Sequence, residues 1–153
     1  MPSITPFLWF DNEAEEAMNF YLSIFKNGRV LDVRRTDGKV FTVTFELHGQ
    51  KIMALNAGPI FKFNEAISLF VDCDTQEEVD ELWEKLSAGG EKTRCGWLKD
   101  KYGLSWQIIP KALGKLLSDP DPRKSQAVMQ AMLKMNKIIV ADLHKAHEQA
   151  TAA

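Results

Sequence analysis

The sequence predicts an α+β fold in which two similar modules are followed by a helical tail. Three observations support this fold class: strand-like and helix-like patterns alternate along the first part of the chain, two helical segments match position by position, and the pattern becomes mainly helical after Pro110. The length of 153 residues is that of one ordinary domain. Each module alone is too small to bury a good core, so we expect the two to form a paired unit.

The first module begins with a strand and a helix. Residues 4–10 are mostly apolar and predict a strand. Asn12 followed by Glu15 predicts a capping box, in which each side chain satisfies a backbone N–H at the start of a helix. An apolar stripe at helical spacing follows, and Asn27-Gly28 predicts its end through a left-handed cap.

Antiparallel strands are predicted after this helix. Residues 29–36 and 40–47 flank Asp37-Gly38, a strong two-residue hairpin signal. Apolar and polar residues alternate along the second of these strands, which is typical of a half-buried strand. His48-Gly49 then predicts a turn into a further strand at residues 50–56.

The second module repeats this order. Residues 66–72 predict a strand, Thr75 followed by Glu78 predicts another capping box, and Gly89-Gly90 ends the helix. The two helices align at a constant offset, which indicates a structural repeat. The matched pairs are Glu15 with Glu77, Glu16 with Glu78, Tyr21 with Trp83, Ile24 with Leu86, and Gly28 with Gly90.

Two β-like segments complete the second module. They are residues 91–95 and 104–109, with a loop around Gly96-Trp97 between them. Residues 57–65 contain Gly58-Pro59 and predict a linker between the modules. The predicted organisation is therefore a paired region at 1–110, with modules at 4–56 and 66–109, and a C-terminal helical extension at 111–153.

The extension lies outside the repeat. Its predicted elements are a short helix at 111–118, a break at 119–122, a Met-rich helix at 123–135, a short strand at 137–140 and a last helix at 142–149. Two interpretations stay open: the extension packs on its own domain, or it contacts a second subunit. Adaptable Met side chains suit both.

Composition and charge exclude several classes of partner. Lys and Arg number 19 and Asp and Glu number 21, so no excess of positive charge is left to neutralise phosphates, and we expect no nucleic-acid partner. No apolar run approaches the roughly 20 residues that span a bilayer, so we expect no membrane partner. Cys73 and Cys95 form no CxxC pair and are expected to be free thiols in a reducing compartment, the cytoplasm.

Several motifs resemble those of a known family. They are Pro6-Phe7-Leu8-Trp9-Phe10, Glu15-Glu16-Ala17 with Phe20-Tyr21, Phe63-Asn64-Glu65-Ala66-Ile67-Ser68-Leu69, Glu77-Glu78-Val79-Asp80 with Leu82-Trp83, Leu86-Ser87-Ala88-Gly89-Gly90, and Tyr102-Gly103 followed by Ser105-Trp106-Gln107-Ile108. On these residues the chain resembles the PhnB-like family, labelled demethylubiquinone methyltransferase, of the vicinal oxygen chelate superfamily of glyoxalase and bleomycin-resistance proteins. The resemblance implies two βαβββ modules that form a cupped mixed sheet. It also implies a homodimer, to which the extension is expected to contribute contacts.

The resemblance also implies where a metal would bind. Enzymes of the superfamily hold a divalent ion with His and Glu side chains on four strands, where it acts as a Lewis acid. Carried over, these positions fall on Thr5 or Pro6, Met53 or Ala54, Ala66 with Glu65 beside it, and Gln107. The best-aligned positions carry neither carboxylate nor imidazole, so we expect no metal and no other cofactor. The three histidines, His48, His144 and His147, are expected in a turn and on a solvated helix face.

A small-molecule pocket is expected in the cup instead. Alternation along the strands places the neighbours of the carried-over positions on the same face, and aromatic groups with a few polar ones are typical of ligand pockets. The candidate pocket residues are Thr5, Phe7, Trp9, Thr44, Glu46, Ser68, Phe70, Trp97, Ser105 and Gln107. Alternatively, Phe7 and Trp9 fill a core, and Trp97, in the same loop as Lys99 and Asp100, is an anchored aromatic in a turn.

These observations favour a metal-free small-molecule-binding protein with an unidentified ligand. The alternative is an enzyme: a metal-dependent lyase, isomerase or dioxygenase, or the methyltransferase of the family label. Methyl donors bound on a doubly wound fold need a glycine-rich turn after a first strand, and the nine glycines form no such motif. No Ser-His-Asp or Cys-His arrangement is apparent, so no catalytic residue is assigned. A structural dimer without a ligand is the third hypothesis.

Overall fold

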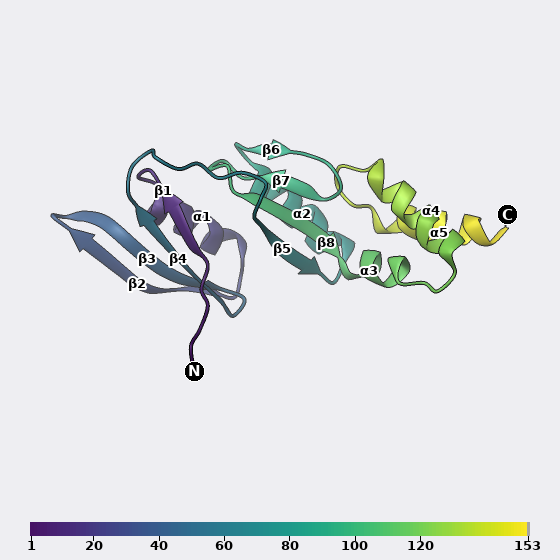
Figure 1. Ribbon diagram of the computed structural model, residues 1–153, viewed down its shortest axis with the longest axis horizontal. Coiled ribbons are helices and arrows are strands. Elements are labelled where there is room, and N and C mark those ends of the chain that lie inside the picture. The colour runs from purple at the N-terminus through teal and green to yellow at the C-terminus, as the bar shows by residue number, and fades with distance from the viewer. Residues whose placement is uncertain (153) are drawn as a thin grey trace. The chain divides into compact units, whose positions relative to one another are not determined.

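The structure is a computed structural model that describes residues 1–152. The chain divides into two compact units, Met1–Lys62 and Phe63–Ala153, which we call the first and second unit (Figure 1). Each unit contains one four-stranded mixed sheet with a helix against it, as the α+β prediction requires. No helix among residues 1–152 is long and apolar enough to cross a membrane.

The first unit follows the order strand, helix and three strands. Its elements are β1 (Phe7–Phe10), α1 (Ala14–Ile24), β2 (Gly28–Thr36), β3 (Lys39–Leu47) and β4 (Gln50–Asn56). The strand order is β1-β4-β3-β2, with β1 parallel to β4 and the other pairs antiparallel. The predicted strand at 4–10 is therefore shorter by three residues, which leaves Thr5 outside it.

The alternation along β3 decides which face of the first sheet is buried. Val43, Phe45 and Leu47 are all buried on the side that α1 covers, and Tyr21 of α1 stacks on Phe45 with 6.2 Å between the ring centroids. Asp37-Gly38 forms the predicted hairpin turn, with φ of 53° and 78° at its two residues. Both the turn and the buried face confirm the sequence prediction.

The start of α1 differs from the prediction. The residue before the helix is Glu13, and the predicted capping box of Asn12 and Glu15 does not form. Instead, the Ala14 backbone N–H donates to Oδ1 of Asn56 at 2.9 Å. A side chain at the end of β4 thus accepts the hydrogen bond of a backbone N–H at the helix start. This acceptor lies 42 residues away in sequence.

The second unit repeats the strand order and adds three helices. Its elements are β5 (Ser68–Cys73), α2 (Gln76–Ser87), β6 (Glu91–Lys92), β7 (Trp97–Lys99), β8 (Ser105–Pro110), α3 (Lys111–Leu117), α4 (Pro122–Leu133) and α5 (Val140–Ala152). The strand order β5-β8-β7-β6 matches the first sheet, with β5 parallel to β8. The predicted cap of α2 is confirmed: the Glu78 backbone N–H donates to Oγ1 of Thr75 at 3.2 Å.

Gly28 and Gly90, which the repeat pairs, share a physical role. A Cβ on Gly28 would lie 3.0 Å from the carbonyl oxygen of Glu46, and one on Gly90 would lie 2.1 Å from that of Lys99. Both glycines therefore let the chain pass close to the third strand of the module. The predicted left-handed cap at Gly28 is wrong, because α1 ends at Ile24 and Gly28 already begins β2.

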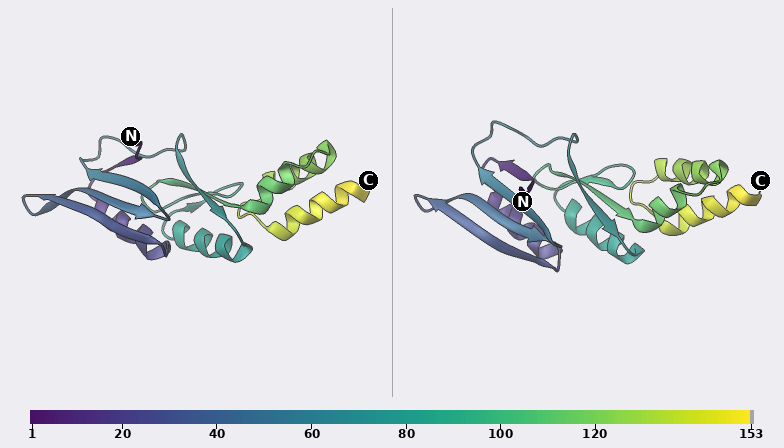
Figure 2. Two further views of the ribbon diagram at one scale, coloured as in Figure 1. Left: turned by 90° about the horizontal axis from the view of Figure 1, so that it is seen from below. Right: turned by 60° about the horizontal axis from the view of Figure 1, so that its bottom comes forward.

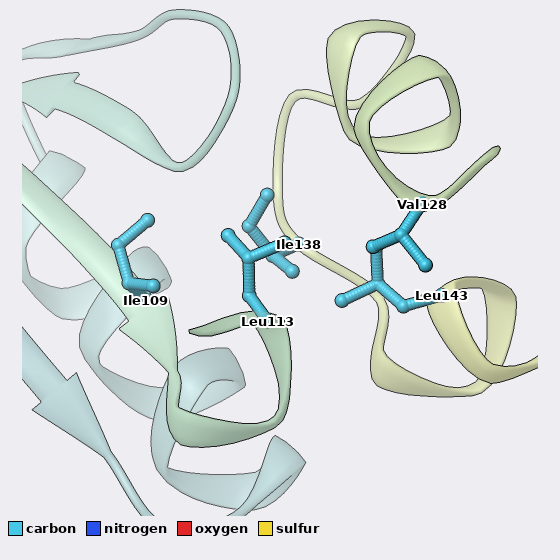
Figure 3. Close-up of a cluster of buried hydrophobic side chains, with 5 residues drawn as sticks. All are labelled: Ile109, Leu113, Val128, Ile138 and Leu143. Atoms are coloured by element: carbon cyan, nitrogen blue, oxygen red, sulfur yellow. The ribbon is translucent and has the colours of Figure 1, made fainter. Parts of the chain in front are cut away.

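The C-terminal helices pack on one another beyond the end of the second sheet, and α3 contacts β8 (Figure 2). Figure 3 shows the buried cluster that joins them, which consists of Ile109, Leu113, Val128, Ile138 and Leu143. The predicted strand at 137–140 is wrong, because Ile138 enters this cluster and α5 begins at Val140. The extension thus packs on its own chain, and a contact with a second subunit remains a prediction.

Candidate functional site

The face of the second sheet opposite α2 brings together the five pocket residues predicted from the second module. Residues paired across neighbouring strands present their side chains on the same face. The two rows of paired residues are Ser68, Ser105 and Lys99, and Phe70, Gln107 and Trp97. The Gln107 side-chain amide donates to Oγ of Ser68 at 2.9 Å. Two of the predicted polar side chains are therefore hydrogen-bonded to each other.

A cleft of about 460 Å³ opens in the second unit. Its lining residues are Glu65, Glu91, Thr93, Arg94, Trp97, Leu98, Lys99 and Ser105. Only Trp97 and Ser105 were among the predicted pocket residues. The list of candidate pocket residues left out four charged side chains of the lining, Glu65, Glu91, Arg94 and Lys99. It was built by analogy with metal-ligand positions, whereas these charges come from the strand edges, the turn before β7 and the segment before β5.

Trp97 and Lys99 lie on a strand and not in the predicted loop. β7 pairs with β6 and β8 over Trp97–Lys99, so both side chains are presented on the cleft face at fixed spacing. The turn before β7 contains Cys95 and Gly96 with φ of 58° and 82°. The prediction of two strands with one loop between them thus missed β7, which is only three residues long.

Ser105 is the most unusual polar residue of the cleft. Its side chain is 1% exposed, and its Oγ has no hydrogen-bond partner within the described part of the chain. Buried hydroxyls are normally satisfied, since leaving one unpaired costs about 1–3 kcal/mol. The cleft thus contains a buried hydrogen-bonding group that the protein itself does not use.

Lys99 forms an ion pair with Glu65, which lies just before β5. The hydrogen bond from Lys99 holds the pKa of the Glu65 carboxyl below its usual value. The same bond raises the pKa of Lys99, and the negative charge of Glu91 adds to this effect. Both partners are therefore charged at neutral pH.

Asp100 positions the strand that carries Ser105. This buried carboxylate accepts hydrogen bonds from the backbone N–H groups of Tyr102 at 2.9 Å and Leu104 at 3.1 Å. It also accepts one from Nε1 of Trp106 at 3.0 Å. Asp100 is thus a structural residue that shapes the β7–β8 turn, and its location next to Lys99 in sequence does not place it in the cleft.

The pocket residues predicted from the first module lie on the first unit and do not line this cleft. Phe7 is half exposed, so it does not fill a core within its unit, and Thr5 is half-buried ahead of β1. Thr44 is buried, while Glu46 is half-buried and pairs with Arg29 at 3.6 Å.

Trp9 has a structural partner. Its indole N–H donates to the carbonyl of Gly58 at 2.9 Å, and its ring meets Phe61 edge-on at 4.9 Å between centroids. Trp9 therefore anchors the linker after β4. This role uses the indole N–H, and no pattern in the sequence indicates it.

The positions carried over from the superfamily do not fit a divalent metal. Two of them, Met53 and Ala66, offer no suitable donor, and the amide of Gln107 is already bonded to Ser68. Within residues 1–152 no group of three or more His, Cys, Asp or Glu side chains is placed to hold an ion. His147 instead pairs with Asp119 at 2.7 Å, within the C-terminal extension.

Comparison with known proteins gives one family and a consistent fold. The profile of the 3-demethylubiquinone-9 3-methyltransferase family matches residues 2–109. The PhnB protein from Bacillus cereus is 38% identical, with a TM-score of 0.67 over 71% of this chain and 99% of that chain. No curated protein matches this chain.

Two further solved structures share the fold at lower identity. Protein PA1353 from Pseudomonas aeruginosa is 18% identical, with a TM-score of 0.60 over 72% of this chain and 98% of that chain. The fosfomycin resistance protein FosX from Listeria monocytogenes, complexed with Mn(II) and sulfate ion, is 18% identical, with a TM-score of 0.54 over 69% of this chain and 88% of that chain.

Proposed function

We propose a function from the premise that this chain belongs to the 3-demethylubiquinone-9 3-methyltransferase family, the PhnB-like family of the vicinal oxygen chelate superfamily. The chain is a metal-free small-molecule-binding protein, and its ligand enters the cleft of the second unit. The observation that carries this proposal is the buried, unpartnered hydroxyl of Ser105 in the cleft lining.

The physical character of the cleft supports this proposal. Ligand pockets commonly have volumes of about 300–1,000 Å³ and combine an apolar or aromatic wall with a few polar groups. Trp97 supplies the aromatic wall, and Ser105 and Lys99 supply polar atoms on one face of the sheet. A ligand atom that bonds to Ser105 removes the cost of the unsatisfied hydroxyl, which favours the bound state.

A fragment screen by ¹H–¹⁵N NMR tests this proposal. We expect small molecules to shift the amide signals of Trp97, Lys99 and Ser105, and the S105A variant to weaken the binding of molecules that bond to the hydroxyl. The S125A variant is the control, because Ser125 lies on α4, far along the chain from the cleft. A diverse library that leaves all cleft signals unmoved contradicts the proposal.

Metal content is tested separately. Elemental analysis of protein purified without chelators is expected to find substoichiometric Ni, Zn, Fe and Mn. This expectation follows from the donor chemistry of the carried-over positions, which offer no carboxylate or imidazole at their best alignment. One equivalent of any of these metals, retained after dialysis, would contradict the metal-free part of the proposal and favour a metal-dependent lyase, isomerase or dioxygenase.

Methyl transfer is the competing function, because the family description names it. Each sheet here mixes one parallel with two antiparallel pairs, and no glycine-rich turn follows β1 or β5. Isothermal titration with S-adenosylmethionine separates the two functions. We expect no heat of binding, and saturable binding of one equivalent per chain would favour the methyltransferase.

We also propose that the protein acts as a cytoplasmic homodimer. Each sheet ends in two edge strands, and among residues 1–152 the outer edge of each of these strands pairs with no other strand. Proteins normally cover such edges. Several large apolar side chains are exposed on the monomer, among them Ile60, Phe61 and Phe70. Sedimentation equilibrium tests the dimer, and the two free cysteines suit a reducing compartment.

A further inference from the structure

We propose that the ligand of this cleft is a small aromatic monocarboxylate whose carboxylate replaces Glu65 on Lys99. This inference rests on the proposed function and names the class of molecule that the cleft recognises. In the structure, Glu65 is the carboxylate partner of Lys99.

The Lys99–Glu65 ion pair joins segments on either side of the strand that carries Ser105. Ser105 on β8 pairs with Ser68 on β5 at one side and with Lys99 on β7 at the other. Glu65 lies three residues before β5 and nevertheless bonds to Lys99, so the ion pair links segments on the two sides of β8. Ser105, on the strand between them, is 1% exposed, and its hydroxyl has no partner among the described residues.

The two partners of the ion pair are unequally exposed to solvent. The Lys99 side chain is 33% exposed, whereas that of Glu65 is 59% exposed. Lys99 is held on a strand between two neighbours, and Glu65 belongs to a turn that is stabilised by the Ala66 N–H donating to Oδ1 of Asn64 at 2.8 Å. Exposed ion pairs contribute little stability, so Glu65 is the partner that a ligand displaces.

The surroundings of Lys99 select the charge of the ligand. A carboxylate is the group that Lys99 already binds. Unlike Glu65, a ligand carboxylate is not tethered to the segment before β5, so it can lie closer to Ser105 and accept the hydrogen bond that the Ser105 hydroxyl does not make to Glu65. Glu91 also faces Lys99 and penalises further negative charge. These neighbours favour a monoanion over a phosphate monoester, which carries close to two charges at neutral pH.

Trp97 is placed to contact the aromatic part of the ligand. Trp97 and Lys99 are two residues apart on β7, so their side chains share a face about 7 Å apart. A ring joined to a carboxylate through at most one carbon spans this distance. The half-buried indole of Trp97 then offers a face for offset stacking.

NMR titration with matched probes tests the inference on the full chain. The probes are indole-3-acetate and its neutral amide, indole-3-acetamide, which have the same ring and nearly the same shape. We expect the acetate to bind about tenfold more tightly than the amide, with shifts at Trp97, Lys99 and Ser105. The E65Q variant is expected to bind the acetate about threefold more tightly, because the competing carboxylate is gone.

Two further variants assign the contacts. K99M keeps the aliphatic stem and is expected to weaken acetate binding about tenfold or more while leaving the amide unchanged. E84Q is the matched control, because Glu84 forms an exposed ion pair with Lys92 on the same unit, at 2.8 Å, and neither residue lines the cleft. Its acetate affinity is expected to equal that of the unmodified chain.

The outcomes separate this inference from the proposed function. Equal affinity for acetate and amide, with shifts in the cleft, overturns the carboxylate assignment and leaves the proposed function standing. An E65Q variant that binds the acetate more weakly overturns the displacement of Glu65. If neither probe moves the cleft signals, the inference is wrong, and the fragment screen described above decides the proposed function on its own.

Discussion

The backbone at Gly90 runs so close to β7 that a side chain has no room there. A Cβ at this position would lie 2.1 Å from the carbonyl oxygen of Lys99 and 2.7 Å from the carbonyl carbon of Asp100. Both contacts are with backbone atoms of the strand that carries cleft residues, so relief requires that strand to move. Gly114 on α3 is the opposite case, because nothing lies within 4 Å of its Cβ position.

These two glycines give a paired prediction. The G90A variant is expected to lose about 3 kcal/mol or more of unfolding free energy through steric strain. The G114A variant is expected to gain about 0.5–1 kcal/mol, because alanine is favoured in a helix. Urea denaturation followed by circular dichroism measures both, and equal stability of the two variants would show that β7 accommodates the extra atom.

Cys73 is a buried thiol at the end of β5, and its surroundings oppose ionisation. Burial raises its pKa to about 12, and the negative charges of Glu78 and Asp72 act in the same direction. Because the thiolate is the reactive form, we expect native Cys73 to react with iodoacetamide at pH 7.5 at least about a thousandfold more slowly than a free cysteine.

Mass spectrometry of peptides after timed alkylation checks this prediction and reports Cys73 separately from Cys95. The same reaction in 6 M guanidinium is the control, since unfolding removes the burial. Rapid labelling of Cys73 in the native protein would mean that the end of β5 opens readily.

At the scale of elements, Gln76 at the start of α2 holds the segment between α4 and α5. Its side-chain amide donates to the carbonyl of Ile138 at 3.0 Å, and its oxygen accepts the Val140 N–H at 2.7 Å. Lys137 adds an ion pair to Asp80 on the same helix at 2.9 Å. One helix of the repeat thus fixes the path of the extension.

Loss of this side chain is expected to loosen the α4–α5 segment. The Q76A variant is expected to lose about 1–3 kcal/mol, because two backbone groups of that segment lose their partner. Amide hydrogen exchange at Ile138 and Val140 is expected to speed up more than exchange in β3. The Q130A variant on the exposed face of α4 is the control, and similar exchange in both variants contradicts the role of Gln76.

At the scale of the whole molecule, the extension completes the core of the second unit. Ile109 at the end of β8 packs with residues from α3, α4, α5 and the connecting segment. Gly96, in the turn before β7, lies against Ile138, since a Cβ there would meet Cγ1 of that side chain at 3.1 Å. The turn that leads into Trp97 therefore depends on the extension.

A chain truncated after Pro110 tests this dependence. We expect a lower unfolding temperature and loss of the cleft NMR signals, because Ile109 and the Gly96 turn lose their apolar cover. Sedimentation equilibrium on the same sample reports whether the extension also joins subunits. A truncated chain that keeps its stability and its dimeric state would show that the extension serves neither purpose.

The sequence by itself determined those features that act over a few residues. Alternation along β3 set its buried face, Asp37-Gly38 set the hairpin, and Thr75 with Glu78 set the start of α2. The repeat could also be recognised, because each module applies the same local rules in the same order. These local rules, together with the motifs, were sufficient for the fold class and the family.

Only the tertiary structure decided which distant groups meet. It brought Asn56 to the start of α1 in place of the predicted cap, and Ile138 into a core in place of a strand. It also paired Glu65 with Lys99 and left the Ser105 hydroxyl without a partner among residues 1–152, which periodicity does not reveal. The physical reason is that a buried polar group takes its partner from whichever segment the fold brings within reach, and sequence spacing does not encode that distance.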